Sequence, residues 1–421
     1  MKKNLFSLFF CLLFLPLFVQ TVSADIIVIT VDGVVNPVMS EFITKSIDHA
    51  EENQDDLLVL QLDTPGGLDS SMRSIVKKII ASKIPVVVYV APSGARAASA
   101  GVFITLAAHV SAMAPGTNMG AAHPVGVGSK MDKTMAEKAV NDASAYIKSL
   151  AERRNRNAEW AEKAVRESVS ITEEEALKLK VIDLISPDLK TLLDTVDGMT
   201  VKTSEGDYTI KTEGIGVQRR NMGFRDKVLD IISNPNVAYL LMLIGFYGIF
   251  FELTNPGSIF PGVIGVLSLI LALYSFQTLP VNYAGLLLIL LAVVLFILEI
   301  KVTSFGLLTI GGIISMTIGS LMLFDSPLPF FRISLSVIIP SIAMTVTLFV
   351  ITVSLVVKAQ KRKPATGSEG LIGSTGVAKT DILTDGSVFL HGEIWSAWSD
   401  TIVKKGEEIV VEEVEDLKLK V

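Results

Sequence analysis

Apolar residues dominate the chain between positions 237 and 357, where they form five runs that are separated by short polar breaks. Each run is close to the ~20 residues that an α-helix needs to cross the hydrocarbon core of a bilayer. The pattern therefore predicts a transmembrane region of about five helices. The expected spans are residues 237–253, 259–279, 283–300, 305–324 and 334–357.

The segment before these runs has a different pattern, in which short apolar runs alternate with stretches of helical periodicity. The apolar runs at residues 26–31, 57–62 and 85–90 are rich in β-branched residues or leucine, as is typical of buried strands. Between them, residues 36–53 and 70–82 carry apolar side chains at helical spacing. Strands that alternate with helices indicate an α/β domain with a largely parallel sheet.

The last part of the chain, residues 365–421, has closely spaced turns between short β-prone runs. This spacing suits a small five-stranded barrel. Such barrels often bind nucleic acid through basic, aromatic faces, but this segment is acidic near its end. We therefore expect it to bind protein or to anchor next to the membrane. Trp395 and Trp398 either form a partner patch or pack within the barrel.

Residues 1–24 have the features of a cleaved secretory signal, with two lysines, an apolar run and the small-residue sequence Val22-Ser23-Ala24 before Asp25. An uncleaved first anchor is the alternative interpretation. The single cysteine, Cys11, lies in this leader. A mature chain without it has neither disulfides nor a cysteine metal site.

The overall composition narrows the function classes further. Only 19% of the 421 residues are charged, below the roughly 25% of an average soluble domain. A net charge of −6 and the lack of an extended basic stripe argue against nucleic acid as a partner. The four histidines form no H-E-x-x-H pair, which argues against a zinc hydrolase. Without a P-loop either, we expect no metal, nucleotide or other cofactor.

Charges around the apolar runs predict the orientation in the membrane. The last run is followed by Lys358-Ala359-Gln360-Lys361-Arg362-Lys363, and such basic segments favour the cytoplasmic side. With five spans, the N-terminal domain is then exported and the C-terminal domain is cytoplasmic. Arg219, Arg220 and Arg225, before the first span, argue for the reverse. The first two spans are also close enough to form a re-entrant hairpin.

Two loops of the α/β domain have the composition of a catalytic site. Asp63-Thr64-Pro65-Gly66-Gly67 follows the second predicted strand, and its paired glycines can turn backbone N–H groups toward a substrate, as an oxyanion hole requires. In the next loop, Ser99 lies among small residues near the start of a predicted helix at residues 97–107. A helix start offers unpaired N–H groups and a positive dipole end. Taken singly, a tight turn and a small-residue packing face explain the two loops equally well.

Together, D-T-P-G-G after one strand and G-A-R-A-A-S-A-G after the next resemble the ClpP-class membrane serine proteases of the NfeD family in its long form. The fold-level resemblance extends to ClpP and signal peptide peptidase A. It implies a ClpP/crotonase-like α/β catalytic domain, an α-helical transmembrane bundle and a small all-β, OB-like C-terminal domain. It also implies Ser99 as the nucleophile, with the backbone N–H groups of Gly67 and Ala100 as oxyanion donors.

A serine nucleophile needs a base to take its proton, and the chain offers two candidates. The resemblance implies a serine–lysine dyad with Lys138, which is carried by the helix that ends in Y-I-K-S-L-A. Lysine acts as a base only where burial lowers its pKa from about 10.4 toward neutrality; a peptide or a partner subunit could complete such a site. The alternative base is His123, at a distance from Ser99 that resembles the serine-to-histidine interval of ClpP. No orienting carboxylate stands out for it, although Asp183 is a distant candidate.

The sequence therefore predicts a membrane-anchored serine endopeptidase with a Ser–Lys dyad. By resemblance, its substrate is an apolar peptide segment of a stomatin- or flotillin-like membrane protein, and its catalytic domain forms a homodimer or a larger assembly. One alternative is a non-catalytic scaffold for such a partner. Another is a crotonase-like acyl-thioester enzyme, which would use backbone donors without a nucleophilic serine. The expected location is the cell membrane, with several spans.

These predictions divide the chain into four parts. They are a signal peptide at residues 1–24, a ClpP-like serine protease domain at residues 25–230, the transmembrane region at residues 237–357 and an OB-like NfeD C-terminal domain at residues 365–421.

Overall fold

The computed structural model describes residues 25–126, 132–254, 257, 259–302, 304, 306–360 and 368–421. The predicted signal peptide and most of the basic run after the last span lie outside these residues. The chain forms two compact units. One unit contains the residues up to 295 and residues 307–342, and the other contains residues 296–306 and 343–421.

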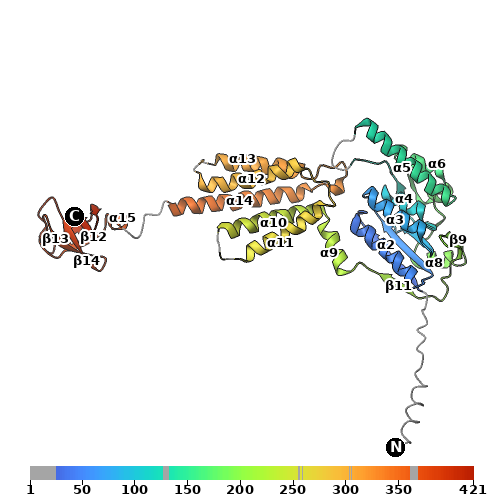
Figure 1. Ribbon diagram of the computed structural model, residues 1–421, viewed down its shortest axis with the longest axis horizontal. Helices are drawn as coiled ribbons and strands as arrows, with labels where there is room; N and C mark the ends of the chain where they lie inside the picture. Colours follow the sequence, from blue (N-terminus) through green and yellow to red (C-terminus); the bar gives the residue numbers. More distant parts are fainter. Residues whose placement is uncertain are drawn as a thin grey trace, which may run out of the picture. The chain divides into compact units, whose positions relative to one another are not determined.

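A six-stranded parallel sheet forms the centre of the described α/β domain (Figure 1). Its strand order is β11-β1-β2-β3-β5-β8, and every neighbouring pair is parallel. The sequence predicted three of the strands, namely β1 (Ile26–Asp32), β2 (Leu57–Asp63) and β3 (Val86–Val90). The others are β5 (Val110–Met113), β8 (Leu184–Ile185) and β11 (Val217–Arg220).

Both faces of this sheet are buried, which explains why its strands read as continuous apolar runs. Side chains such as Ile29 and Leu60 lie in one core cluster, and Val28 and Val59 lie in another. The first cluster includes α2 (Pro37–Glu52), α3 (Asp69–Ala81) and α4 (Ala100–Ala107). The second includes α8 (Leu189–Val196) and packs against the hairpin of β9 (Thr200–Thr203) and β10 (Gly206–Thr209).

A smaller three-stranded sheet in the same domain is absent from the sequence prediction. It consists of β4 (Arg96–Ala98), β6 (Asn118–Gly120) and β7 (Ser170–Thr172). The sequence predicted a helix from residue 97, but α4 begins only at Ala100. The residues before it are a strand because they pair with β6, which is too distant in sequence for local propensity to reveal.

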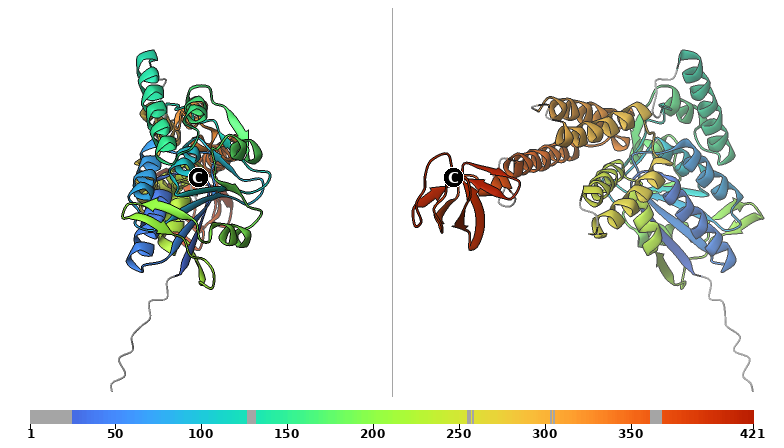
Figure 2. Two further views of the ribbon diagram at one scale, coloured as in Figure 1. Left: turned by 90° about the vertical axis from the view of Figure 1, so that its right-hand side faces the viewer. Right: turned by 60° about the vertical axis from the view of Figure 1, so that its left-hand side comes forward.

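Two helices, α5 (Lys133–Arg153) and α6 (Ala158–Arg166), pack against each other at the edge of the α/β domain. The second half of α5 buries Ile147 and Leu150 in the core, whereas its first half, which carries Lys138, is mostly exposed. Figures 1 and 2 show α5 extending beyond the rest of the domain.

Arg156 stabilises the C-terminal end of α4. Its side chain is 2% exposed, and its guanidinium donates hydrogen bonds to the backbone carbonyls of Thr105, Leu106 and Ala108 and pairs with Asp183. The C-terminus of a helix carries a partial negative charge, so a buried cation there is favourable. Arg156 thus fixes one end of the helix whose other end begins next to Ser99.

The substitution Arg156→Met is expected to lower the free energy of unfolding by about 1.5–3 kcal/mol, because it removes the hydrogen bonds of a buried guanidinium to three carbonyls and its ion pair with the partly exposed Asp183. Urea unfolding of the full chain in detergent micelles, followed by circular dichroism, measures this change. Arg153→Met is the matched control, since Arg153 is exposed at the end of α5. Equal unfolding midpoints for the two variants would contradict a stabilising role for Arg156.

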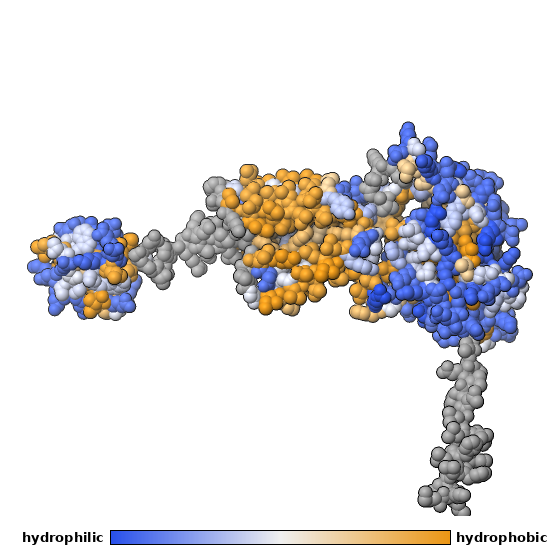
Figure 3. Space-filling view, viewed as in Figure 1, coloured by the Kyte–Doolittle hydropathy of each residue, from blue (hydrophilic) through white to orange (hydrophobic). Residues whose placement is uncertain are grey.

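Among the described residues, five apolar helices follow the α/β domain at the predicted positions. They are α10 (Pro235–Thr254), α11 (Phe260–Phe276), α12 (Tyr283–Lys301), α13 (Leu307–Met322) and α14 (Leu335–Gln360). Two described segments, Pro235–Leu253 and Pro329–Ile351, are long and apolar enough to cross a membrane by themselves; the apolar parts of the others are shorter. Figure 3 shows apolar side chains gathered over this region.

The helices α10 and α11 pack so closely that their backbones touch. A Cβ atom added to Gly248 would lie 2.4 Å from the carbonyl oxygen of Pro261, and one added to Gly265 would lie 2.8 Å from the amide nitrogen of Ile249. Small residues at a helix interface permit this approach. A close helical pair is compatible both with two spans and with a re-entrant hairpin.

The C-terminal domain is a β-sheet domain whose described strands have the order β15-β12-β13-β14-β17-β16. They are β12 (Thr375–Ala378), β13 (Gly386–Leu390), β14 (Glu393–Trp398), β15 (Glu408–Val410), β16 (Glu413–Glu415) and β17 (Lys418–Lys420). The prediction of five strands is wrong by one, because the acidic segment near the end pairs with β17 as an extra strand. Trp395 packs against the domain core, and Trp398 lies under the ammonium group of Lys420.

Candidate active site

The two loops that the sequence analysis singled out lie against each other. The N–H of Thr64 donates a hydrogen bond to the carbonyl of Arg96 over 2.8 Å, and the N–H of Ala98 donates to the carbonyl of Thr64 over 3.0 Å. The Asp63 carboxylate accepts a third bond, from the N–H of Arg96, over 3.0 Å. These bonds join the end of β2 to β4 and so bring the glycine pair beside Ser99.

Ser99 occupies a sharp turn between β4 and α4. Its φ of 53° and ψ of −111° are unusual for a residue with a side chain. Its backbone N–H is fixed by a 2.9 Å hydrogen bond to the carbonyl of Gly120, while its half-buried hydroxyl has no hydrogen-bond partner within the described chain. A serine on a strained strand-to-helix turn is the arrangement that presents a nucleophile to a substrate.

Gly66 lies directly against Ser99, and only glycine fits there. Its φ is +121°, and an added Cβ would lie 2.8 Å from the Ser99 Cβ and 3.2 Å from the Ser99 Oγ. The sequence analysis noticed the glycine pair but gave Gly66 no role of its own. The contact between the glycine and the serine depends on the pairing of two distant segments, so the motif alone could not reveal it.

Two backbone N–H groups next to Ser99 are unpaired among the residues that the structure describes. The N–H of Val35 donates a 2.9 Å hydrogen bond to the carbonyl of Gly66, and the carbonyl of Val35 accepts a 2.9 Å hydrogen bond from the N–H of Leu68. In this parallel bridge the N–H of Gly67, which lies between them in sequence, has no acceptor among the described residues. The N–H of Ala100 is also unpaired, because the first residues of a helix lack an intrahelical acceptor. Such donors can stabilise an oxyanion that forms at the serine.

Lys138 forms no hydrogen bond with Ser99 among the described residues. It is exposed on the first half of α5, and it forms no hydrogen bond or ion pair with any described residue. It precedes the buried Ile147 by roughly two and a half helical turns, so the two residues lie on opposite faces of α5. The described residues of the single chain therefore do not give Lys138 the water-poor surroundings that a lysine base needs.

His123 lies on the exposed segment that follows β6. Its Nδ1 is 2.8 Å from the carbonyl oxygen of Val165, and no described carboxylate orients it. Asp183 is engaged elsewhere, since it accepts a 2.7 Å hydrogen bond from the N–H of Ser111 and pairs with Arg156. The structure thus gives His123 a free second ring nitrogen but no triad.

The buried histidine of this domain is His109, at the opposite end of the sheet. Its Nδ1 accepts a 3.1 Å hydrogen bond from the N–H of Val86, the first residue of β3. Burial, together with the charges of Arg154 and Arg156, lowers its pKa to about 3. The loops that surround Ser99 follow the other ends of the strands, so His109 is not part of the candidate site.

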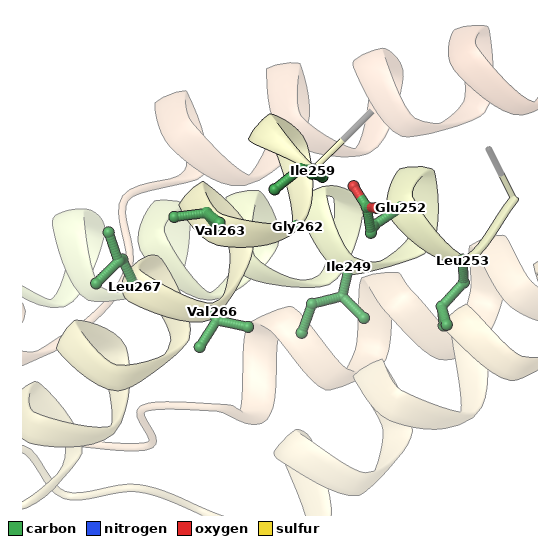
Figure 4. A pocket seen from close by; sticks show the side chains of 8 residues that line it. All are labelled: Ile249, Glu252, Leu253, Ile259, Gly262, Val263, Val266 and Leu267. Atoms are coloured by element: carbon green, nitrogen blue, oxygen red, sulfur yellow. The ribbon is translucent and has the colours of Figure 1, made fainter. Parts of the chain in front are cut away.

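A separate cavity of about 510 Å³ lies between α10 and α11 (Figure 4). It is lined by apolar residues, and Glu252 contributes the single charged side chain. The Glu252 Oε2 is buried and has no hydrogen-bond partner among the described residues. None of the site residues predicted from the sequence lines this cavity, so it is distinct from the candidate active site.

Three family models match consecutive parts of the chain. They are the NfeD1b N-terminal domain at residues 25–203, the NfeD integral membrane domain at residues 236–356 and the NfeD-like C-terminal, partner-binding domain at residues 368–421. The membrane-bound protease PH1510 of Pyrococcus horikoshii is 37% identical over 383 residues, which cover 88% of this chain and 87% of that protein. The chain belongs to the NfeD family. The resemblance drawn from the two loop motifs is thereby confirmed.

The chain is also similar to other proteins. Membrane protein NfeD1b of Bacillus subtilis is 28% identical over 413 residues, covering 93% of this chain and 91% of that protein. One similar solved structure is a lysine-to-alanine mutant of the 1510-N membrane-bound stomatin-specific protease in complex with a substrate peptide. It is 36% identical in sequence, and the match covers 50% of this chain and 98% of the solved chain, with a TM-score of 0.47. The solved structure of ClpP1 from Listeria monocytogenes is 20% identical. The match covers 39% of this chain and 94% of the ClpP1 chain, with a TM-score of 0.34.

The expected fold class is also confirmed. An α/β domain, an apolar helical region and a β-sheet domain follow one another in the predicted order, and each is matched by a domain of the NfeD family. The integral membrane domain together with the two long apolar helices identifies a membrane protein.

Proposed function

We propose that this NfeD-family chain is a membrane-anchored serine endopeptidase with Ser99 as nucleophile and Lys138 as base. The observation that carries the proposal is the strained turn at Ser99, where the hydroxyl and the nearby N–H groups of Gly67 and Ala100 have no hydrogen-bond partner among the described residues. The relationship to a membrane-bound protease supports the same class of reaction.

The proposed reaction begins when the Ser99 Oγ attacks the carbonyl carbon of a peptide bond and uncharged Lys138 accepts the hydroxyl proton. The former carbonyl oxygen becomes an oxyanion, to which Gly67 and Ala100 donate hydrogen bonds. Collapse of this intermediate breaks the C–N bond, and the leaving amine takes the proton from Lys138. Water then attacks the acyl carbon and gives a proton to Lys138. The bond between this carbon and the Ser99 Oγ breaks, Oγ takes the proton back from Lys138, and the acid product leaves with the serine hydroxyl and the uncharged lysine restored.

Lys138 is the part of this site that a single chain leaves incomplete. A lysine in water keeps its proton at neutral pH, and only burial lowers its pKa enough for it to act as a base. A second catalytic domain, or a peptide that lies over the first half of α5, would provide the cover. We therefore include in the proposal that the active form is a homodimer or a larger assembly.

Removing the close contact between Gly66 and Ser99 tests the geometry of the site. Gly66→Ala is expected to reduce peptide cleavage by roughly 10²-fold, because the new methyl displaces the nucleophile by a fraction of an ångström or more. Gly94→Ala is the matched control: Gly94 also has a positive φ, +89°, but an added Cβ there meets nothing within 4 Å. Equal cleavage rates for the two variants would contradict the proposed position of Ser99.

His123 remains a second candidate for the base. If its Nδ1–H donates to the carbonyl of Val165, its Nε2 carries a lone pair that can accept a proton. Histidine also needs less of a pKa shift than lysine does to be a base near neutral pH. Two arguments favour Lys138 over His123. No described carboxylate contacts His123, and the loop motifs of the sequence resemble a family that uses a serine–lysine dyad.

For the substrate, we propose an apolar segment of a stomatin- or flotillin-like membrane protein. Two findings support it: a relative is named as stomatin-specific, and the family describes the C-terminal domain as partner-binding. The exposure of Lys138 favours a second candidate function, a non-catalytic scaffold that holds such a partner at the membrane.

One experiment separates these functions. The full chain is reconstituted in nanodiscs and incubated with apolar peptides, a stomatin-like protein and an acyl thioester, and products are identified by mass spectrometry. Peptide cleavage supports the endopeptidase. Binding of the stomatin-like protein without cleavage at any protein concentration supports the scaffold. Thioester turnover without peptide cleavage points to crotonase-like chemistry instead.

We also propose that several of the apolar helices span the membrane, with the catalytic domain outside the cell and the C-terminal domain inside. Cysteines introduced at the exposed Lys190 and Lys404 report on the two domains. On intact cells, a membrane-impermeant maleimide is expected to label Lys190→Cys, and to label Lys404→Cys only after permeabilisation. The opposite labelling pattern would reverse the orientation.

A further inference from the structure

The short helix α9 (Phe224–Ile232) connects the α/β domain to the first apolar helix and has two contrasting faces. The side of α9 that carries Asp230 is fixed to the protein, because the Asp230 carboxylate accepts a 2.7 Å hydrogen bond from the side-chain amide of Asn36. Ile232, at the end of the helix, is buried as well. The backbone carbonyl of Ile232 also accepts a hydrogen bond from the hydroxyl of Ser275 at the end of α11. The position of α9 next to the apolar helices is therefore well defined.

The other face of α9 is apolar and uncovered. Phe224 is 86% exposed and Ile231 is 59% exposed. Seven residues correspond to almost two full helical turns, so both side chains lie on one face, with the half-buried Val228 between them. A phenylalanine this exposed is unusual for a surface that contacts only water, particularly with a second large apolar residue on the same face.

The basic and acidic residues of α9 also lie on different sides of the helix. The exposed Arg225 and Lys227 flank the apolar face by helical periodicity, whereas Asp226 and Asp230 lie toward the face that contacts the protein. An apolar face bordered by basic residues is the pattern of a helix that lies in a membrane interface. A basic border attracts anionic headgroups over distances of a Debye length.

We propose that α9 is an interfacial anchor, whose face of Phe224, Val228 and Ile231 enters the surface of a bilayer that contains anionic phospholipids. Continuity with the membrane region supports this occupant, because only two residues separate the end of α9 from the start of α10 at Pro235. The bilayer surface is thus the medium next to α9. Since α9 is also bonded to α2 through Asn36, the anchor holds the Ser99 domain close to the lipid surface.

Site-directed spin labelling of the full chain in nanodiscs tests the proposal. Cys11 is the only native cysteine, so a Cys11→Ser background accepts single nitroxide labels. Labels are placed at Phe224→Cys and Ile231→Cys, with Lys190→Cys as the aqueous control and Ile244→Cys, exposed on α10, as the acyl-chain control. Collisions with oxygen and with a water-soluble nickel chelate are measured in phosphatidylcholine alone and in equal parts phosphatidylcholine and phosphatidylglycerol.

For the labels at 224 and 231, the collision rate with oxygen is expected to be severalfold higher than the collision rate with the nickel chelate. The ratio of the two rates should lie between the ratios measured for the two controls. Phosphatidylglycerol should increase the insertion depth of both labels, and Lys227→Gln should reduce that increase, since Arg225 remains. Values like those of the aqueous control at both positions would overturn the proposal. Protection from both reagents would also overturn it, because a protein then covers the face. An insertion depth that is the same with and without phosphatidylglycerol would overturn the proposed role of anionic headgroups.

Discussion

Ser99→Ala is expected to reduce peptide cleavage by the full-length protein by at least about 10³-fold, with no loss of folding. Removal of the nucleophile from a serine protease leaves only the rate enhancement due to the oxyanion donors and to binding. The effect is expected to fall on kcat, because Gly67 and Ala100 still position the substrate carbonyl. Cleavage of an apolar peptide in nanodiscs, followed by mass spectrometry, measures the change.

Ser93→Ala is the matched control for that experiment. Ser93 lies shortly before β4 and is exposed, whereas Ser99 follows β4 in the strained turn that precedes α4. Its substitution should leave kcat within a factor of about two, since exposed positions away from special backbone geometry tolerate change. A Ser99→Ala protein that cleaves as fast as the Ser93→Ala protein would refute the nucleophile.

Lys138→Ala is expected to lower kcat by about 10²–10⁴-fold, the usual contribution of a general base. Lys138→Arg should be equally impaired, because a guanidinium group does not give up its proton in proteins. Lys133→Ala, an exposed lysine of the same helix, is the control and should retain activity. The kcat values of the three purified variants, compared at equal protein concentration, measure the effect.

The same cleavage assay also tests His123, the other candidate for the general base. Full activity in Lys138→Ala together with a large loss in His123→Ala would transfer the role to His123. Mixed assemblies of Ser99→Ala and Lys138→Ala subunits then test where the base comes from. Recovery of activity on mixing would show that one subunit supplies the lysine to the serine of its neighbour, as the exposure of Lys138 in the single chain suggests.

Much of the architecture could be predicted without coordinates, because it depends on local patterns. The continuous apolar strands β1, β2 and β3 and the helices between them are visible as runs and periodicities, since a parallel sheet buried on both faces needs apolar side chains at every position. Length and hydropathy likewise reveal the five apolar helices. The loop motifs around Gly67 and Ser99 were enough to indicate the family and to single out a candidate nucleophile.

The rest depends on contacts between residues that are far apart in the chain. The strand β4 exists because of its pairing with β6, and the positive φ of Ser99 follows from that pairing and from the start of α4. The fit of Gly66 against Ser99 is a contact across two loops. These are consequences of tertiary packing, which overrides the helical propensity that the alanine-rich segment shows by itself.

Residue identities alone thus fixed the order of the domains, the membrane region and the candidate nucleophile, because these depend on composition and short-range periodicity. Tertiary structure decided that, within the described part of the chain, the hydroxyl of Ser99 and the nearby N–H groups of Gly67 and Ala100 are left unpaired and Lys138 faces solvent. The physical reason is that hydrogen-bond partners and burial belong to three-dimensional neighbours, which one-dimensional spacing does not specify.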